Sequence, residues 1–196
     1  MNENRNIERP IDKIADELLI HRSQEGSKQA LEALLTRWQE PLWRHAVRMT
    51  RDSSLADDVL QESLIAIVRQ IRNLNDPARF RSWAYRIVTF KAADQIRSRQ
   101  RSRKIESAVS EKAEELESDE PALDKPVDLL RAAMQRLNEN DRLILTLFYL
   151  EEMKISEVAN ICSIPLGTVK SRLFKARSSL KKILDIKFNP NNQNHE

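Results

Sequence analysis

Residues 164–182 read IPLGTVKSRLFKARSSLKK, and this stretch decides how the C-terminal part of the chain folds. Apolar side chains recur in it at spacings of three and four residues, which predicts an amphipathic helix. The predicted buried face consists of Val169, Leu173, Ala176, Leu180 and either Ile183 or Leu184. The other faces are basic, and no acid occurs before Asp185. Because a helix that is only solvated usually mixes charges of both signs, we expect a negatively charged partner.

A shorter helix is predicted directly before this one, over residues 156–162. Ser156 is placed to cap its start, with Ile155 before it as a hydrophobic staple. The connection SIPLG contains a proline and a glycine, so we expect a turn there and a long helix that begins at Thr168. Two helices joined by such a short turn are typical of a helix-turn-helix, whose second helix enters the major groove of DNA.

The second helix of this predicted helix-turn-helix starts with hydroxyl and basic side chains. Hydroxyls and a helix N-terminus suit phosphate oxygens, whereas Arg and Lys suit guanine edges in the major groove. The candidate DNA-binding residues are Thr168, Lys170, Ser171, Arg172, Lys175 and Arg177. Helix-turn-helix shapes and basic helices also occur in proteins that bind no nucleic acid, so spacing alone leaves that alternative open.

The composition limits the class of protein. With 196 residues, 40% hydrophobic and 32% charged, the chain is predicted to be soluble and globular, with one ordinary domain or two small ones. Two glycines leave little room for hairpins or phosphate-binding loops, and the single Cys162 fits a reducing cytoplasm, so we expect an all-α cytoplasmic protein without a cofactor. The chain has neither an apolar run of about 20 residues, as a membrane span requires, nor a secretion signal.

Charge is distributed in blocks, although the formal net charge is only +3. Residues 79–104 contain nine basic residues and one acid, residues 105–126 contain eight acids and two basic residues, and residues 170–187 contain seven basic residues and one acid. The acidic stretch also ends in prolines, which is typical of a linker. We therefore expect two small helical domains, residues 10–104 and 127–187, joined by an acidic linker at residues 105–126.

Hydrophobic periodicity predicts the helices of both domains. The N-terminal domain is expected to have about four, and those that the pattern defines are residues 29–49, 55–74 and 81–103, with a break at NLNDPARF, residues 73–80. The C-terminal domain is expected to have helices at residues 127–137, 141–150 and 156–162, followed by the basic helix.

Three segments together resemble the extracytoplasmic-function (ECF) sigma factors, the smallest class of the bacterial sigma-70 family. EVANICSIPLGTVKSRLFKARSSLKKIL is similar to the last conserved region of that family, LADDVLQESLIAIVRQIRNL to its second region, and FRSWAYRIVTFKAADQIRSRQR to the segment directly after it. The resemblance implies a non-enzymatic protein that binds core RNA polymerase, recognises promoter DNA through two domains and helps to melt it. Many members of the family are restrained by an anti-sigma factor, which is therefore a further candidate partner.

The resemblance implies a polymerase-binding face on the helix at residues 55–74, which in the family docks onto a coiled coil of the largest core subunit. Asp58 and Gln61 match the positions that dock there, and they share a polar face with Asp57 and Glu62. Acidic and amide groups would complement a basic partner surface. Without the resemblance, the three carboxylates would be interpreted as an ordinary solvated helix face.

The resemblance also implies residues that recognise the minus-ten promoter element. The loop NLNDPAR, residues 73–79, matches the segment that receives a base flipped out of that element, and amide and backbone groups suit the polar edge of such a base. In the next helix, aromatic surfaces could stack on unpaired bases while basic side chains follow the backbone. The candidate residues are Asn73, Asn75, Arg79, Trp83, Phe90, Lys91, Arg97 and Arg101.

Two aromatic positions carry alternatives. The spacing of Phe80, Trp83 and Ile87 also fits core packing, and this is the expected role of Trp83 and Tyr85. Phe90 departs from the family pattern, which has an asparagine at the corresponding position. Because a phenylalanine cannot make the hydrogen bonds of an amide, either Phe90 stacks on a base or minus-ten recognition is unusual in this chain.

Two other functions fit parts of the sequence. In a metal-dependent nuclease or recombinase, Asp57, Asp58 and Glu62 would hold magnesium. Adjacent aspartates diverge by about 100° around a helix, however, and the three scattered histidines form no catalytic or zinc pattern. A stand-alone helix-turn-helix regulator would leave the long N-terminal domain without a role. No metal site is predicted.

Overall fold

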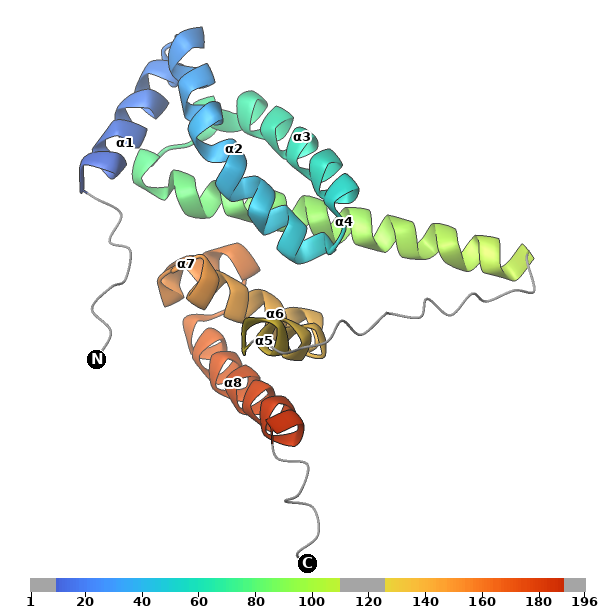
Figure 1. The fold of residues 1–196 in the computed structure, drawn as a ribbon. Helices are drawn as coiled ribbons and strands as arrows, with labels where there is room; N and C mark the ends of the chain where they lie inside the picture. Colours follow the sequence, from blue (N-terminus) through green and yellow to red (C-terminus); the bar gives the residue numbers. More distant parts are fainter. Residues whose placement is uncertain (1–9, 110–125, 189–196) are drawn as a thin grey trace, which may run out of the picture. The chain divides into compact units, whose positions relative to one another are not determined.

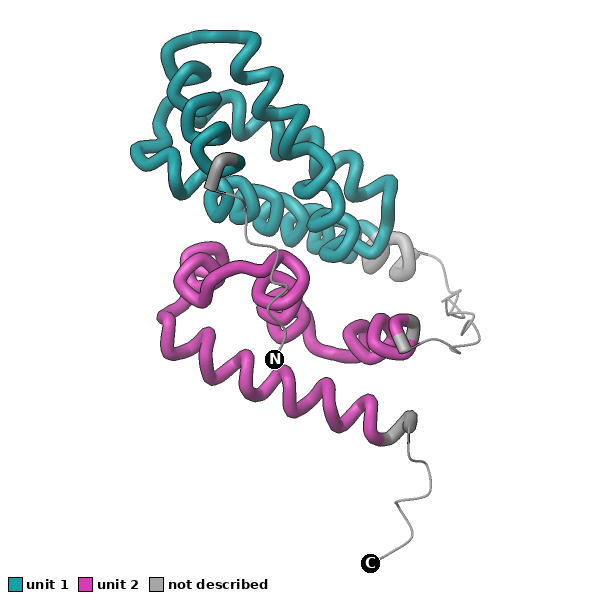
Figure 2. Tube along the Cα trace, turned by 60° about the vertical axis from the view of Figure 1, so that its left-hand side comes forward, with its two compact units in different colours: residues 1–112 teal, residues 113–196 magenta. Residues whose placement is uncertain are grey.

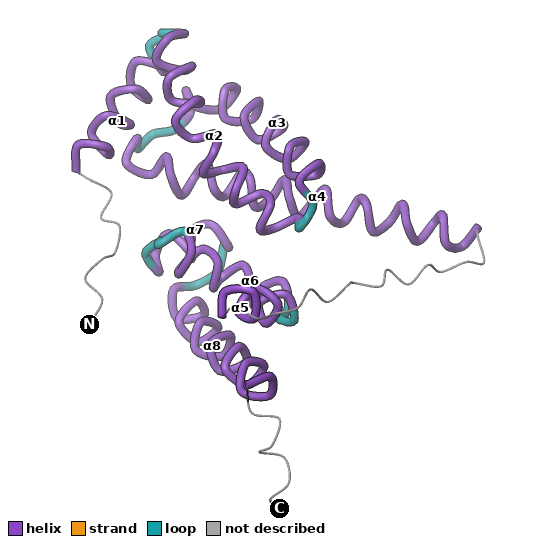
Figure 3. The backbone as a smooth tube through the Cα atoms, in the orientation of Figure 1, coloured by secondary structure: helices purple, strands orange, loops and turns teal. Residues whose placement is uncertain are grey.

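The computed structural model describes residues 10–109 and 126–188, which contain helices and turns and no strand (Figures 1 and 3). The chain forms two compact units, residues 1–112 and 113–196 (Figure 2). The all-α fold with two small helical domains is therefore confirmed. Of the expected acidic linker, residues 105–109 continue the last helix of unit 1, and residues 110–125 lie outside the described residues.

Within its described residues, 10–109, unit 1 contains four α-helices and two short 3₁₀ turns. Figure 1 shows how these elements are arranged. The α-helices are α1 (Pro10–Gln24), α2 (Lys28–Thr50), α3 (Ser53–Gln70) and α4 (Phe80–Val109). The 3₁₀ turns are η1 (Ile71–Asn73) and η2 (Pro77–Arg79), and the break predicted at residues 73–80 contains η2 and the last residue of η1. The expected helix at residues 55–74 therefore ends earlier as an α-helix, and its last turn tightens into η1.

Local sequence sets the two sharp corners of unit 1. Between α1 and α2, Gly26 adopts a φ of +99°, a conformation that side chains disfavour, and Ser27 then caps α2 by accepting a bond from the Ala30 N–H. Between α2 and α3, Arg51 is left-handed at φ 60°, and Asp52 caps α3 by accepting a bond from the Leu55 N–H at 3.1 Å. Each helix thus starts at a defined residue.

The core of unit 1 lies where α2, α3 and α4 pack against one another, with α1 packed on α2. Leu34, Leu42, Val59, Ile67 and Val88 are fully buried there. An aromatic cluster joins α2 to α4: Trp38 lies edge-on to Phe80 and Tyr85, and His45 lies beside Tyr85 and shares a 3.0 Å hydrogen bond with Thr89. The expected core role of Tyr85 is confirmed, because only 2% of its surface is exposed.

Unit 2 contains α5 (Pro126–Gln135), α6 (Glu139–Leu145), the π-helical turn η3 (Thr146–Leu150), α7 (Ile155–Cys162) and α8 (Leu166–Phe188). The segment expected as one helix at residues 141–150 is helical throughout, but it begins at Glu139 and its second half is π-helical. The Glu151 N–H bonds to the Thr146 carbonyl, five residues back, so the backbone widens into one π turn. Glu151 and Met153 are both buried directly after this turn.

The helix starts expected around the turn between α7 and α8 are also corrected. Ser156 does not cap α7; the helix begins one residue earlier, and the Lys154 N–H donates to the Glu157 carboxylate at 2.8 Å. Helix α8 begins at Leu166, two residues before Thr168, because the Val169 N–H already bonds to the Pro165 carbonyl. The proline and the glycine thus belong to the helix start, where proline is well tolerated.

The core of unit 2 is built from α6, η3, α7 and α8, with α5 packed on α8. Ile144, Leu147, Val158 and Ile161 are buried in it together with Val169, Leu173 and Ala176 of α8. Cys162 is the last residue of α7, and partial burial raises the pKa of its thiol to about 11. The predicted apolar face of the basic helix is therefore confirmed at its three N-terminal positions.

Candidate polymerase and nucleic-acid interfaces

Helices α7 and α8 form the helix-turn-helix that the sequence predicts. Ser163 ends α7 in the left-handed conformation at φ 55°, and its N–H bonds to the Ala159 carbonyl. Only Ser163, Ile164 and Pro165 separate the two helices. Because Val169, Leu173 and Ala176 anchor α8 in the core, the opposite side of this helix faces solvent along its first three turns.

The candidate residues of α8 lie mainly on this solvent-facing side. Lys170, Ser171, Lys175 and Arg177 are exposed, whereas Thr168 and Arg172 are half-buried. Ser171 donates its hydroxyl to the Thr168 carbonyl at 3.0 Å, which leaves its oxygen free to accept. Among the residues that the structure describes, no ion pair involves any of these basic side chains, so their charges are directed to solvent.

Phe174 is a further candidate DNA-binding residue, which was not predicted from the sequence. Its side chain is 67% exposed in the middle of the basic side of α8. It lies one turn from Lys170 and from Arg177, and one residue off the buried apolar face. An exposed ring flanked by cations suits contact with apolar groups in the major groove, such as the thymine methyl group. The sequence could have indicated it, because Phe174 falls outside the three- and four-residue spacing of the buried apolar side chains.

On α3, two of the four candidate side chains form hydrogen bonds with other described residues of unit 1, and the other two do not. Asp57 accepts a 2.7 Å hydrogen bond from the indole of Trp43, and Glu62 accepts bonds from Lys91 at 3.0 Å and Gln95 at 2.7 Å. Asp58 and Gln61 are exposed and make no side-chain hydrogen bond or ion pair with the described part of the chain. The pair that matches the docking positions is therefore the available pair.

Two apolar side chains extend this face of α3. Ile65 is 45% exposed and Val68 is 41% exposed. With Asp58 and Gln61 they occupy positions spaced by three, four and three residues, which places all four on one stripe of the helix. This spacing is that of a coiled-coil seam, so the stripe suits a partner helix. The polar half of the stripe was predicted from the sequence, whereas its apolar half was not.

The segment from the last residue of η1 to η2 presents two amides to solvent. Asn73 and Asn75 are exposed, and neither side chain bonds to another described residue. Asp76 caps η2 by accepting from the Ala78 N–H at 3.1 Å, and Arg79 pairs with Asp76 at 3.1 Å. Arg79 is thus held by its own loop, whereas the two asparagines remain available to an incoming polar group.

The aromatic candidates of α4 differ in exposure. Trp83 is half-buried with its ring 5.8 Å from that of Phe80, so it packs on the core while part of its surface stays accessible. Phe90 is 46% exposed, and the Arg86 guanidinium lies over its ring at 5.5 Å. Phe90 therefore presents a stacking surface next to a cation.

The basic candidates of α4 are mostly paired within unit 1. Lys91 pairs with Glu62 of α3, and Arg97 pairs with Asp94 at 2.8 Å. Arg99 pairs with Asp52, the cap of α3, and this ion pair together with the Leu55 N–H lowers the pKa of the Asp52 carboxyl. Arg101 is exposed. Lys91, Arg97 and Arg99 are thus paired with carboxylates of the same unit, whereas Arg101 forms no such pair within the described residues.

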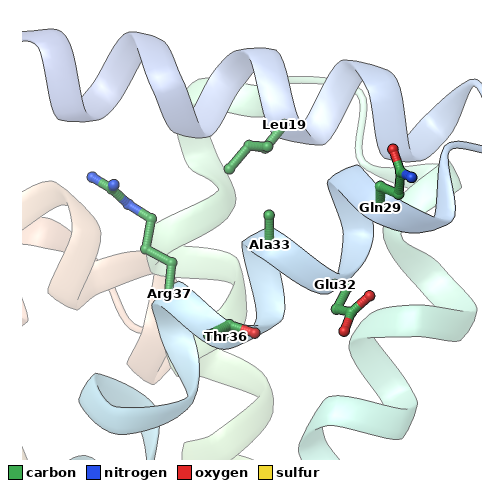
Figure 4. A pocket seen from close by; sticks show the side chains of 6 residues that line it. All are labelled: Leu19, Gln29, Glu32, Ala33, Thr36 and Arg37. Atoms are coloured by element: carbon green, nitrogen blue, oxygen red, sulfur yellow. The ribbon is translucent and has the colours of Figure 1, made fainter.

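Within the described residues, neither a surface hollow nor a group of metal-ligating side chains forms another candidate functional site. A shallow, open hollow between α1 and α2 is lined by Leu19, Gln29, Glu32, Ala33, Thr36 and Arg37 (Figure 4). Its arginine is already paired with Asp12 at 3.0 Å and Asp16 at 2.7 Å. Within the described ranges, no three His, Cys, Asp or Glu side chains gather as a metal site, and no helix has the length and apolar character of a membrane span.

Comparisons with known proteins agree on both units. The family model described as Sigma-70 region 2 matches residues 34–102, and the one described as Sigma-70, region 4 matches residues 128–180. The chain is 31% identical to RNA polymerase sigma-H factor of Pseudomonas aeruginosa, over 86% of this chain and 93% of that protein. It is 30% identical to ECF RNA polymerase sigma-E factor of Haemophilus influenzae, over 87% and 95%.

Solved structures match the fold as well. CnrH, determined in complex with the cytosolic domain of CnrY, has a TM-score of 0.64 at 24% identity, covering 87% of this chain and 97% of that one. The sigma factor RpoE of Bartonella quintana, determined in complex with the anti-sigma factor NepR, has a TM-score of 0.60 at 20% identity, covering 79% and 96%. These identities are low, so the two matches support the all-α fold alone.

Proposed function

The chain belongs to the extracytoplasmic-function (ECF) sigma factors of the sigma-70 family, and from this premise we propose how its two units share the work of starting transcription. As a sigma factor it binds core RNA polymerase and promoter DNA. The matches to both sigma-70 regions and to named sigma factors favour this function over a nuclease or a stand-alone regulator. The observation that carries the proposal is that the two family regions fall in order on two separate units, region 2 within unit 1 and region 4 within unit 2.

Core polymerase would bind the stripe of α3 formed by Asp58, Gln61, Ile65 and Val68. Its polar half supplies orientation and its apolar half supplies buried area, the combination that stable helix-on-helix docking needs. Asp57 and Glu62 act mainly within unit 1, because Trp43 and Lys91 already engage them. This assignment narrows the four candidates of α3 to two and adds two apolar contacts.

Promoter opening would fall to the loop and helix that come after α3. Asn73 and Asn75 offer amide groups for the edge of a flipped base, and Phe90 offers a ring for stacking on an unpaired base. Binding unstacked bases supplies free energy for melting, so the chain needs no nucleotide hydrolysis and acts without chemistry of its own. Lys91, Arg97 and Arg101 would then follow the DNA backbone.

Helix α8 would hold the minus-thirty-five element. Its available cations attract phosphates, and Thr168, Lys170, Ser171 and Arg172 lie in the first two turns, where a recognition helix meets base edges. We further propose that the chain acts in the cytoplasm, where polymerase is, and that an anti-sigma factor restrains it. The solved relatives were each determined in complex with another protein, and one of these is named an anti-sigma factor.

Run-off transcription tests the proposal. A bacterial core RNA polymerase is given a pool of promoter fragments with the wild-type chain, with Asp58→Arg or with no addition. We expect initiation at a subset of fragments with the wild type only, because the arginine repels a basic docking surface. The control Glu40→Arg changes an exposed acid on α2 and should initiate normally. No selective initiation with the wild type would overturn the proposal.

A further inference from the structure

The side chain of Gln24 connects the end of α1 to the loop that presents Asn73 and Asn75. Its amide nitrogen donates to the Ile71 carbonyl at 2.9 Å and to the Leu74 carbonyl at 2.8 Å, across 47 and 50 residues of sequence. Both protons of the amide are therefore used on one short piece of backbone. These are long-range bonds between α1 and the start of the loop.

The two carbonyls lie where α3 and η1 end, and carbonyls at the end of a helix lack a partner within it. The Ile71 carbonyl also accepts from the Leu74 N–H at 3.1 Å, which closes the 3₁₀ turn. Gln24 thus acts as a C-terminal cap supplied from another helix. It fixes the direction of the backbone where it leaves η1, directly beside Asn73 and Asn75.

The position of Gln24 is itself well fixed. It is the last residue of α1, and the Gly26 corner with the Ser27 cap holds it next to α2. Ile20, one turn earlier, is fully buried, and α1 packs against η1 and η2. At the far end of the loop, Phe80 is 2% exposed within the aromatic cluster. The loop is therefore anchored at both ends while its asparagines stay exposed.

We propose that Gln24 is a positioning residue for promoter opening, which holds the loop at residues 73–79 in the shape that receives an unpaired base. The inference rests on the proposed function of this loop. It assigns a role to α1, for which no sequence pattern indicates one. The decisive property is the two donated protons, since an acceptor of the same shape would repel the carbonyl oxygens.

Three substitutions separate donation from shape. Gln24→Glu keeps the size of the side chain but removes both donors at neutral pH. Gln24→Leu is apolar and close in size. Gln24→Lys restores donors at similar reach. Gln39→Leu on α2 is the matched control, because Gln39 is exposed and bonds to no other described residue.

The assay uses holoenzyme made from each variant and a promoter that the wild type opens, with 2-aminopurine at successive minus-ten positions. Because two hydrogen bonds are lost, we expect the opening rate to fall about tenfold for Gln24→Leu and further for Gln24→Glu. The Gln24→Lys and Gln39→Leu variants should stay within about threefold of the wild type. Affinity for core polymerase should be unchanged in all four variants.

The outcomes distinguish this inference from the function on which it rests. If Gln24→Glu and Gln24→Leu open the promoter at the wild-type rate, the positioning role is wrong although the sigma function stands. If core affinity and opening fall together, Gln24 supports the fold of unit 1 and has no specific role in base capture. If the wild type opens no promoter, the proposed function itself fails.

Discussion

Helices α4 and α8 are both rich in basic residues, but their charges are used differently in the isolated chain. On α4, Lys91 and Arg99 are paired with carboxylates of Glu62 and Asp52, and Arg97 is paired with Asp94 on its own helix. On α8, no described basic side chain forms an ion pair. The basic side chains of α8 can therefore attract phosphate directly, whereas Lys91, Arg97 and Arg99 of α4 must exchange partners before they can do so. We infer that duplex DNA meets unit 2 first.

The largest expected effect comes from removing the unpaired charges of α8. Lys170→Ala, Lys175→Ala and Arg177→Ala together should weaken binding of the free chain to duplex DNA by on the order of a hundredfold at low salt. The slope of log affinity against log salt should fall by about 2 to 3. Fluorescence anisotropy across a salt series measures both quantities.

The matched triple variant on α4 is Lys91→Ala, Arg97→Ala and Arg99→Ala. Because these cations already have partners, its effect on duplex binding by the free chain should stay below about tenfold. Equal losses for the two triple variants would show that the pairing in unit 1 does not screen these charges, and the contrast between the helices would be lost.

A further comparison of α8 with α4 uses their exposed rings, Phe174 and Phe90, and the larger of the two expected effects on DNA binding is about tenfold. Phe174→Ala should reduce the preference of the chain for its own minus-thirty-five duplex over random duplex by about tenfold, because an apolar contact in the major groove is removed. Phe90→Ala should leave that preference unchanged and weaken holoenzyme binding to single-stranded minus-ten DNA by about fivefold or more, through lost stacking. A reversed pattern would mean that the two helices exchange roles.

A smaller effect should come from Glu62→Gln, which releases Lys91. We expect the affinity of the free chain for duplex DNA at low salt to rise about twofold to threefold, since exposed ion pairs are weak. Asp58→Asn is the control, because it removes one acid from α3 without releasing a cation. Equal gains in the two variants would point to long-range repulsion as the cause.

The smallest effect concerns the pH dependence of unit 1. Arg99 and the Leu55 N–H lower the pKa of Asp52, so the ionised form stabilises the fold above the ordinary carboxyl pKa, and this contribution is lost as pH falls through the lowered value. In Arg99→Ala the pKa of Asp52 should rise towards its usual range. The gap in unfolding free energy between wild type and variant should close at pH values below about 4. Carboxyl NMR titration and acid unfolding check this.

Most of the fold could be predicted from sequence because it depends on apolar periods. The stripe of Val169, Leu173 and Ala176 repeats every three or four residues, and these residues are buried in α8. The helix starts were less predictable, since Pro165 and Gly167 were interpreted as a turn although both are acceptable where a helix begins. No local sequence pattern indicates the π turn at Thr146–Leu150, because the burial of its first residues, Thr146 and Leu147, depends on tertiary packing.

The candidate site was predictable in its residue types but not in their pairings. The helical pattern puts Asp57, Asp58 and Glu62 on one helix, but only the structure shows that Trp43 and Lys91 engage two of them. Such pairs join residues 14 and 29 positions apart, which no local pattern reveals. For the same reason the 47-residue link from Gln24 to Ile71 was invisible in the sequence.

The half-buried Cys162 gives unit 2 a chemical reporter of its own opening. Its pKa of about 11, against an ordinary 9.0, means about a hundredfold less thiolate at neutral pH than an open chain would offer, and the thiolate is the reactive form. The chain has no second cysteine. A thiol reagent should therefore react faster when α7 separates from α8, so a change in the labelling rate reports a change in how often that happens. Promoter DNA that holds the two helices together should slow the reaction.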